Sequence, residues 1–267
     1  MNFLIAGYAY SAGGLSANPA LKITNAELKL DTPVLAYARS LDAWGHSAKF
    51  DAIVPGSCLT GSADVDGVSK TRDVCGLHDP AFRFSVNFLG APALTLKEFA
   101  GYRQDLVAGA SLQVLPPWGQ YDSTRLVNLG TNRWTFRPEI GISKTLDSFT
   151  LELALAASVY SINDDFFGGK RLEQDPMYSG QAHLIHQFRN GAWAALNGTY
   201  YWGGRTTVDG VRKDDRQKAS RLGATLALPV DRHNSVKLYA STGVSIRTGT
   251  DFDLFGIAWQ HRWGGGL

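Results

Sequence analysis

Residues 149–160 read Phe149-Thr150-Leu151-Glu152-Leu153-Ala154-Leu155-Ala156-Ala157-Ser158-Val159-Tyr160. Side chains alternate between the two faces of a β-strand, so every second residue of this stretch shares a face. One face carries only apolar residues, from Phe149 to Val159, and the other is small or polar with one carboxylate, Glu152. A strand of this length with one apolar and one polar face can cross a bilayer at a tilt. The stretch therefore predicts a membrane-spanning strand of a β-barrel.

Similar alternating stretches recur along the whole chain. Their expected spans are 2–11, 32–41, 47–57, 79–89, 103–115, 132–144, 148–161, 177–189, 192–203, 218–229, 234–246 and 252–263. Strands of globular proteins usually have about five or six residues, so this length favours a membrane barrel over a soluble sandwich, which also alternates. We expect an all-β fold: an antiparallel up-and-down transmembrane β-barrel of about 12 strands, as one domain over residues 1–267.

The connections between these strands alternate in length. Short connections are expected at 42–46, 145–147, 190–191 and 230–233, and long ones at 12–31, 58–78, 116–131, 162–176 and 204–217, with 246–251 as a short exception among the long ones. Short turns at one end and long loops at the other are typical of outer-membrane barrels. An even number of strands puts both termini at the short-turn end. In the connection 90–102, Thr95 followed by Glu98 predicts a capped helical turn.

Composition excludes several classes of protein. The net charge is +2 without a basic block, which gives nucleic-acid binding no support. No apolar stretch approaches the roughly 18 residues of a transmembrane helix. The segment Met1 to Tyr8 reads as a strand and not as a signal peptide, so we expect the sequence to begin at or inside the mature chain.

The polar face of the expected strands carries charges of both signs. Inside a barrel they would line a water-filled path, or pair across neighbouring strands and hold a narrow barrel together, and the two roles are compatible. Arg137 and Glu139 are expected beside Glu152, and Lys49 and Asp51 beside Arg83. Twelve strands leave a narrow interior that suits small solutes. The expected lumen-lining residues are Arg39, Lys49, Asp51, Arg83, Arg137, Glu139, Glu152, Tyr160, Tyr201, Arg221, Lys237, Tyr239 and Arg262, with Tyr10 and Tyr37 as further inward stacking surfaces.

Aromatic residues lie near the ends of the expected strands, where a barrel meets the membrane interfaces. The expected girdle comprises Trp134, Phe136, Tyr200, Trp202 and Phe255 at the long-loop end, and Phe149, Phe188 and Trp263 at the other end. Cys58 and Cys75 fall in one long connection, and in an exported protein they form a disulfide candidate.

No pattern indicates a catalytic or metal site. His183 and His186 lie three residues apart on one strand and therefore on opposite faces, so they cannot bind one ion together. Asp164, Asp165 and Asp175 read as a solvated loop in preference to a calcium site. The sequence contains no nucleophile elbow, zinc-protease motif or phosphate loop. We expect no cofactor and no enzymatic activity.

Several segments together resemble a known bacterial family. They are Gly109 to Val114, Gly119 to Asp122, Asn128 to Trp134, Pro138 to Gly141, Glu173 to Pro176, Gly203 to Thr207 and Trp259 to Trp263. In order and spacing they resemble the outer-membrane proteins labelled MetA-pathway of phenol degradation. The resemblance implies a barrel in the bacterial outer membrane that admits aromatic compounds, with lipid, a small solute and the outer-membrane assembly machinery as partners. One departure is Gly264-Gly265-Gly266-Leu267 after Trp263, since such barrels usually end on an aromatic residue.

The main hypothesis is therefore a passive transporter for small, hydrophobic or aromatic solutes. A structural or adhesive barrel, whose loops do the work, is one alternative. A membrane hydrolase on the same barrel is another, and it would need a Ser-His pair on the rim. A soluble all-β protein is the third.

Overall fold

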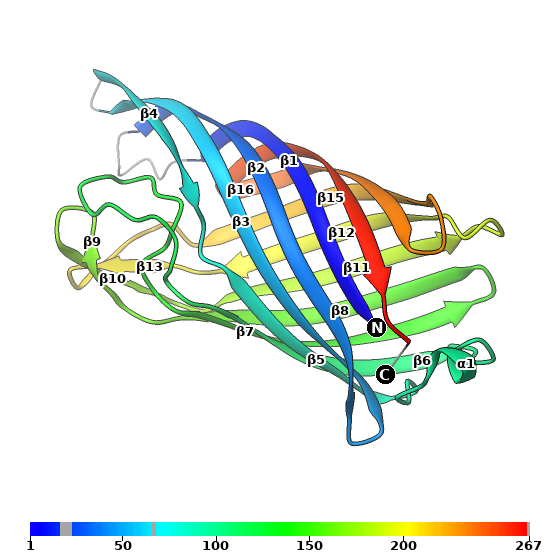
Figure 1. The fold of residues 1–267 in the computed structure, drawn as a ribbon. Coiled ribbons are helices and arrows are strands. Elements are labelled where there is room, and N and C mark those ends of the chain that lie inside the picture. The colour runs from blue at the N-terminus through cyan, green and yellow to red at the C-terminus, as the bar shows by residue number, and fades with distance from the viewer. Residues whose placement is uncertain (17–22, 66–67, 266–267) are drawn as a thin grey trace.

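The computed structural model describes residues 1–16, 23–65 and 68–265, and their strands form one closed antiparallel barrel (Figure 1). Each strand of the wall pairs with its neighbours in chain order, and β1 pairs with both β2 and β16, which closes the wall. The wall strands are β1 (Asn2–Ser16), β2 (Ile23–Ala43), β3 (His46–Val65), β5 (Ala81–Leu89), β6 (Leu106–Leu115), β7 (Thr135–Leu146), β8 (Phe149–Tyr160), β11 (Met177–Gln187), β12 (Trp193–Gly203), β15 (Gln217–Pro229) and β16 (Asn234–Trp263).

Strand β16 forms two adjacent parts of the wall. Its first half pairs with β15 and its second half pairs with β1. The halves also contact each other, because Arg262 N donates to His233 O at 2.8 Å and Thr242 Oγ1 donates to Asp253 Oδ1 at 2.6 Å. The chain therefore reverses within β16. With its two arms counted separately, the closed wall has 12 strands, as predicted.

The outer face of the wall is apolar and exposed. Ile140, Leu155, Leu196 and Leu222 are 61%, 58%, 66% and 57% exposed. Ile140 and Leu155 lie opposite each other on β7 and β8, and the registers of the following strands place Leu196 and Leu222 on the same outer face. Soluble proteins rarely expose large contiguous apolar patches, whereas a membrane barrel presents such a band to lipid. The wall is therefore that of an outer-membrane β-barrel.

The two ends of the barrel differ as the sequence predicts. The start of β1 and the end of β16 lie at the end of the barrel that carries α1 (Leu96–Phe99) (Figure 1). Helix α1 begins after a capping box, in which Thr95 N donates to Glu98 Oε2 at 2.9 Å and Thr95 Oγ1 accepts from Glu98 N at 3.4 Å. The tight turn at this end between β11 and β12 has Gly191 at φ +83°. None of the described residues forms a helix long and apolar enough to span a membrane.

The long-loop end contains more strand than the sequence predicts. The expected loop 58–78 is a hairpin, because β3 continues to Val65 and pairs with β4 (Val68–Leu77). Most of the expected loop 12–31 is strand as well, and its residues 17–22 lie outside the described residues. The loops 162–176 and 204–217 build a small second sheet of β9 (Asn163–Phe166), β10 (Lys170–Gln174), β13 (Thr206–Val208) and β14 (Val211–Arg212). Polar, Gly-rich sequence suggested loops there, but backbone pairing overrides that local preference.

Candidate functional site

The inner face of the barrel carries most of the charged residues of the wall. Residues opposite each other on antiparallel strands share a face, so the strand registers divide inner from outer positions. Arg83 on β5 and Arg137 on β7 both lie opposite Gln113 of β6, so the three residues share a face. The chain neighbours Phe84 and Phe136 lie on the other face, in the exposed apolar band. Twelve of the predicted lumen residues fall on the inner face: Lys49, Asp51, Arg83, Arg137, Glu139, Glu152, Tyr160, Tyr201, Arg221, Lys237, Tyr239 and Arg262.

The expected lumenal position of Arg39 is wrong. Arg39 lies opposite Asn2 of β1 and Phe50 of β3, and Asn2 lies opposite Trp263. Arg39 therefore shares the outer face with Trp263. Near the end of its strand, a long cationic side chain can reach the polar membrane interface from the outer face. Charge alone does not decide the facing of a residue at this position.

The expected inward facing of Tyr10 and Tyr37 is also wrong. Tyr10 lies opposite Phe255, and Tyr37 contacts the Trp263 ring with centroids 6.3 Å apart. Both tyrosines therefore belong to the outer face. The inner face of β2 carries Ala36 and Ala38 instead, which are 9% and 6% exposed.

An ion-pair network covers the inner wall over β5 to β11. Glu139 accepts from Arg83 Nη2 at 2.6 Å and pairs with Arg137 Nη2 at 3.3 Å. Gln181 Nε2 donates to the same carboxylate at 3.2 Å, and Arg137 Nη2 donates to Ser179 Oγ at 3.3 Å. One carboxylate thus balances two guanidinium groups within this network, and the second carboxylate of this wall, Glu152, lines the same cavity as Glu139.

The expected position of Arg137 and Glu139 beside Glu152 is wrong, because Glu152 lies opposite Ser143 whereas Glu139 lies opposite Ala156. The expected position of Lys49 and Asp51 beside Arg83 is confirmed by the register, but the ion pairs differ. Asp51 lies opposite Arg83, yet Arg83 turns to Glu139, and Asp51 pairs with Lys49 at 3.1 Å. Glu152 accepts only from Ser143 Oγ at 3.3 Å among the described residues. Opposite it lies His183, whose Nδ1 contacts Asn197 Oδ1 at 2.8 Å. The outward facing of His186, against Phe149, keeps the two histidines on opposite faces as predicted.

Two cavities open between these inner side chains. The first, of about 350 Å³, is lined by residues that include Arg83, Ser111, Glu139, Glu152, Gln181 and His183. The second, of about 440 Å³, lies at the short-turn end between Trp193, Lys237 and Arg262. Their volumes are those of small-molecule sites. Gln181 and Trp193 occupy inner positions of alternating strands, so facing alone would have identified them.

A buried carboxylate anchors the loop 116–134 at the long-loop end. Asp79 is 6% exposed, and its Oδ1 accepts from Gly119 N at 2.8 Å. Its Oδ2 accepts from Thr131 N at 2.8 Å and Thr131 Oγ1 at 2.7 Å. Asn163, 1% exposed, also donates to Thr131 O at 3.2 Å. The loop is therefore fixed at both of its ends.

The expected stacking surface of Tyr160 is already covered by a protein side chain. The Arg133 guanidinium lies 4.2 Å from the Tyr160 ring centroid and also donates to Gln174 Oε1. A cation in this position occupies the ring face. Tyr160 lies on the inner face but does not offer that face to a solute.

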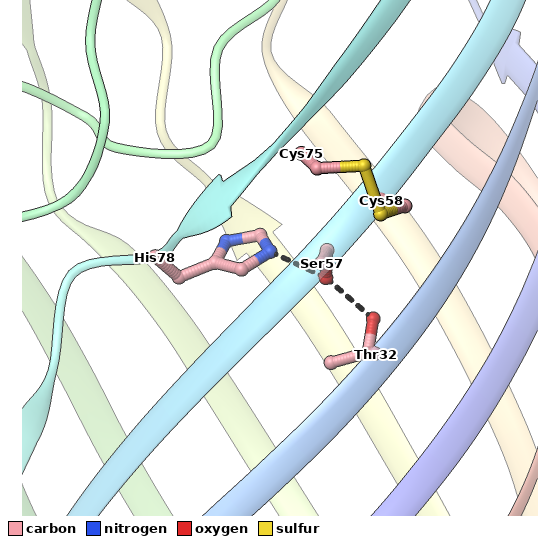
Figure 2. The surroundings of a disulfide bond; sticks show 5 residues. All are labelled: Thr32, Ser57, Cys58, Cys75 and His78. Carbon is pink, nitrogen blue, oxygen red and sulfur yellow. Dashed lines mark hydrogen bonds between the residues drawn. A yellow bond between two sulfur atoms is a disulfide. The ribbon is translucent and has the colours of Figure 1, made fainter.

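The predicted cysteine pair is joined in the structure, close to a Ser-His contact that the sequence did not reveal (Figure 2). Cys58 and Cys75 lie opposite each other on β3 and β4. His78 Nε2 and Ser57 Oγ are 2.8 Å apart, and Thr32 Oγ1 lies 2.6 Å from Ser57 Oγ. The Leu129 backbone and the Asp79 carboxylate also act on the His78 ring, and both favour its protonated form.

This Ser-His contact does not form a nucleophilic site. Ser57 is only 3% exposed, so its hydroxyl is not open to a substrate. The contact instead connects β2, β3 and the residues after β4. Among the described residues, no group of three His, Cys, Asp or Glu side chains is placed to hold a metal ion.

The predicted girdle residues all lie on the outer face, in small aromatic groups. At the long-loop end, Trp134 stacks on Phe136 with centroids 6.2 Å apart, and Trp202 contacts Tyr200 at 5.8 Å. At the short-turn end, His186 contacts Phe149 at 4.6 Å and Phe188 at 4.7 Å, and His261 stacks on Trp263 at 5.8 Å. Phe255 is 58% exposed opposite Tyr10. These groups occupy the outer surface where interfacial aromatics are expected.

Comparison with known proteins identifies the family. The family model described as "Putative MetA-pathway of phenol degradation" matches residues 18–260. The chain belongs to this family. No curated protein matches the sequence of this family member.

Solved structures are similar to this family member in fold. The COG4313 outer membrane channel from Pseudomonas putida F1 matches with a TM-score of 0.81 and 19% identity, over 97% of this chain and 94% of that one. The transport unit of the autotransporter AIDA-I from Escherichia coli matches with a TM-score of 0.57 and 8% identity, over 98% and 90%. The β domain of the Bordetella autotransporter BrkA gives 0.55 and 10%, over 98% of both chains. These likenesses show an outer-membrane barrel fold.

Proposed function

We propose that this protein is a passive outer-membrane channel for small solutes, with hydrophobic or aromatic compounds of the phenol type as cargo for a degradation pathway. The observation that carries the proposal is the inner face itself. Charged and polar side chains line the inside of a closed wall whose outside is apolar, and cavities of about 350 and 440 Å³ lie between them. Such an interior serves water and small solutes in outer-membrane barrels.

Two findings from related proteins support the proposal. The structure with the same fold from Pseudomonas putida F1 is described as an outer membrane channel. The family description names phenol degradation, which supports an aromatic cargo. We propose no catalytic role, and we propose that the outer-membrane assembly machinery inserts the barrel.

Planar-bilayer recording of the refolded protein tests this function. We expect discrete conductance steps that phenol partly blocks, because a solute in a narrow lumen obstructs ion flow. Heat-denatured protein serves as the control. Stable insertion without current, together with unchanged phenol uptake in a deletion strain, would refute the channel and favour a structural role. Esterase activity of the folded protein would favour the hydrolase alternative.

A further inference from the structure

The cavity at the short-turn end of the lumen is built by small side chains between larger ones. Trp193 of β12 and Lys237 of β16 both lie opposite Ala227 of β15, so the three share the inner face in one row across neighbouring strands. Ala227 is 6% exposed and fills little space between its two neighbours. Arg262 and Gln260, from the second arm of β16, complete the wall of this cavity of about 440 Å³. The cavity is thus present because the small side chain of Ala227 lies between the long side chains of Trp193 and Lys237.

Trp193 gives this cavity an aromatic surface inside the barrel. Trp193 lies opposite Ala227 on one side and Gln187 on the other, and Asn190 and Gly191 of the β11–β12 turn also line the cavity. By contrast, the girdle tryptophans Trp134, Trp202 and Trp263 lie on the outer face. Lys237 Nζ lies over the Trp193 ring, 5.4 Å from its centroid, which is farther than the 4.2 Å that separates the Arg133 guanidinium from the Tyr160 centroid. A planar ring that stacks on Trp193 would therefore place a substituent near this ammonium.

The positive charges of the cavity are not neutralised by protein carboxylates. Lys237 is exposed to the lumen, and no described side chain forms an ion pair or hydrogen bond with it. Arg262 Nε donates to the Arg232 carbonyl at 2.8 Å, and its two terminal nitrogens form no hydrogen bond with the side chains or backbone of the described residues. Lys49 of β3 is the other cation near Lys237, and its own partner is Asp51. The site therefore has a net positive charge.

The nearby acidic and histidine groups are already engaged elsewhere. Asp231 Oδ1 accepts from His233 N at 2.7 Å and Asn234 N at 2.8 Å, and its Oδ2 accepts from Asn234 Nδ2 at 2.7 Å. These bonds close the β15–β16 turn. His233 Nδ1 contacts the Arg262 carbonyl at 3.1 Å. Neither group competes for the ammonium of Lys237.

We propose that this cavity is a binding subsite for an aromatic carboxylate, with the ring of the ligand on Trp193 and its carboxylate between Lys237 and Arg262. Bonds between a carboxylate and ammonium or guanidinium donors are charge-assisted and stronger than neutral ones. A role of this subsite in transport rests on the proposed channel function. Binding of the ligand does not depend on transport. The subsite adds anionic aromatic compounds to the proposed substrates, which a test with neutral phenol alone would miss.

The test is ¹⁹F NMR of 4-fluorobenzoate with the refolded barrel in detergent micelles, with empty micelles as the blank. We expect saturable binding to the wild type, and affinity about tenfold weaker for Lys237→Met, which keeps the length of the chain but removes the charge. Trp193→Leu, which keeps apolar bulk but loses the ring, should weaken binding about fivefold. Lys97→Met on α1, at the same end of the barrel but outside the cavity, is the matched control and should bind as the wild type does.

Neutral 4-fluorobenzyl alcohol separates charge recognition from stacking, and it should bind about tenfold more weakly than the carboxylate. Wild-type affinity in both Lys237→Met and Trp193→Leu, or equal affinity for the neutral analogue, would overturn the subsite. The heat-dependent gel shift of folded barrels confirms that each variant is folded. Binding without conductance would remove the channel function and leave the subsite, whereas conductance without binding would remove only the subsite.

Discussion

Arg83 on β5 and Glu139 on β7 form an ion pair at 2.6 Å although β6 lies between their strands. The intervening inner residue of β6 is Ser111, which lies opposite Glu139 and accepts from Arg83 Nε at 3.1 Å. A small hydroxyl side chain at this position leaves the guanidinium room to reach across. Glu139, with 15% of its side chain exposed, thereby connects three strands of the wall.

Glu139→Gln should destabilise the barrel. The change removes the charge that balances Arg83 and Arg137 and leaves two cations close together on a half-buried wall. We expect a loss of about 1–2 kcal/mol in the free energy of unfolding, below the value for a fully buried pair because the Arg83 side chain is 36% exposed. Urea unfolding in detergent, followed by tryptophan fluorescence, measures it.

The control for this change is Asp105→Asn. Asp105 pairs with Lys144 at the barrel end, where the two side chains are 77% and 45% exposed. Exposed pairs contribute little, so we expect a loss below about 0.5 kcal/mol. Equal losses of unfolding free energy in the two variants would show that the Arg83 network stabilises the barrel no more than an exposed ion pair does.

Charge reversal inside and outside the wall should separate the lumen from the membrane face. Arg137→Glu converts an inner cation to an anion and should shift the reversal potential in a salt gradient toward cation selectivity. Lys237→Glu should act in the same direction. Arg39→Glu changes the charge identically but on the outer face, so it should leave the reversal potential unchanged. A shift in Arg39→Glu as large as that in Arg137→Glu would contradict the assigned facing.

Asp79→Asn should loosen the loop 116–134. The amide nitrogen cannot accept a hydrogen bond, so either Gly119 or Thr131 loses its buried acceptor. A buried donor without a partner costs about 1–3 kcal/mol. We expect faster cleavage of this loop by added protease.

Asp122→Asn is the matched control in the same loop. Asp122 is exposed, and its carboxylate bonds only locally, with Thr124 at 2.6 and 2.9 Å and Arg125 at 3.9 Å. Cleavage of the loop should stay at the wild-type rate. Unchanged cleavage in Asp79→Asn itself would mean that other contacts hold the loop.

Loss of the disulfide should affect the hairpin and spare the wall. Cys58 and Cys75 are 17 residues apart, and a crosslink over that distance contributes up to about 3 kcal/mol by loop entropy, less here because β3 and β4 already pair. In the double variant Cys58→Ser, Cys75→Ser we expect faster proteolysis within 58–78 and an unchanged unfolding midpoint of the barrel. A lowered midpoint would show that β4 supports the closed wall.

Alternation predicted the facing of strands whose two faces differ in chemistry, and it failed where they do not. On β8 every outer residue is apolar and Glu152 marks the inner face. On β1 and β2, small apolar residues such as Ala9, Ala36 and Ala38 fill the inner face, so neither side is distinctly polar, and Arg39 was misplaced. A slip of one residue exchanges the faces, and no local signal corrects it.

Contacts between distant segments were beyond the reach of sequence patterns. Asp79 and Thr131 lie 52 positions apart, and nothing in the sequence near either residue indicates the other. The Ser57–His78 contact depends on the extension of β3 past the predicted end of its strand. The disulfide was predictable because both cysteines fall in one connection. Polar loops at the long-loop end pair into strands through tertiary contacts that local preference does not describe.

Acidification should loosen the long-loop end of the barrel through His78. Burial lowers the pKa of this imidazole from its ordinary value of 6.5, and the Leu129 carbonyl and the Asp79 carboxylate only partly oppose the effect. The unfolded segment therefore takes up a proton more readily than the folded one. The contribution of neutral His78 to stability is complete above about pH 6.5 and is lost as the pH falls through the lowered folded pKa. We expect protease cleavage of 58–78 and 116–134 to accelerate between about pH 7.5 and about pH 5, relative to a substrate peptide at each pH.

His78→Gln tests the assignment, because glutamine can still bond with Ser57 but does not titrate in this range. Its cleavage rate should stay nearly constant over the same pH interval. His46→Gln, at the start of β3 at the opposite end of the barrel, should keep the acceleration of the wild type. If His78→Gln accelerates as the wild type does, the acid response comes from another group, and the Ser57–His78 contact is only a pH-independent connection between strands. If only His78→Gln loses the response, protonation of one buried imidazole controls the local stability of the segments 58–78 and 116–134 at the long-loop end of the barrel.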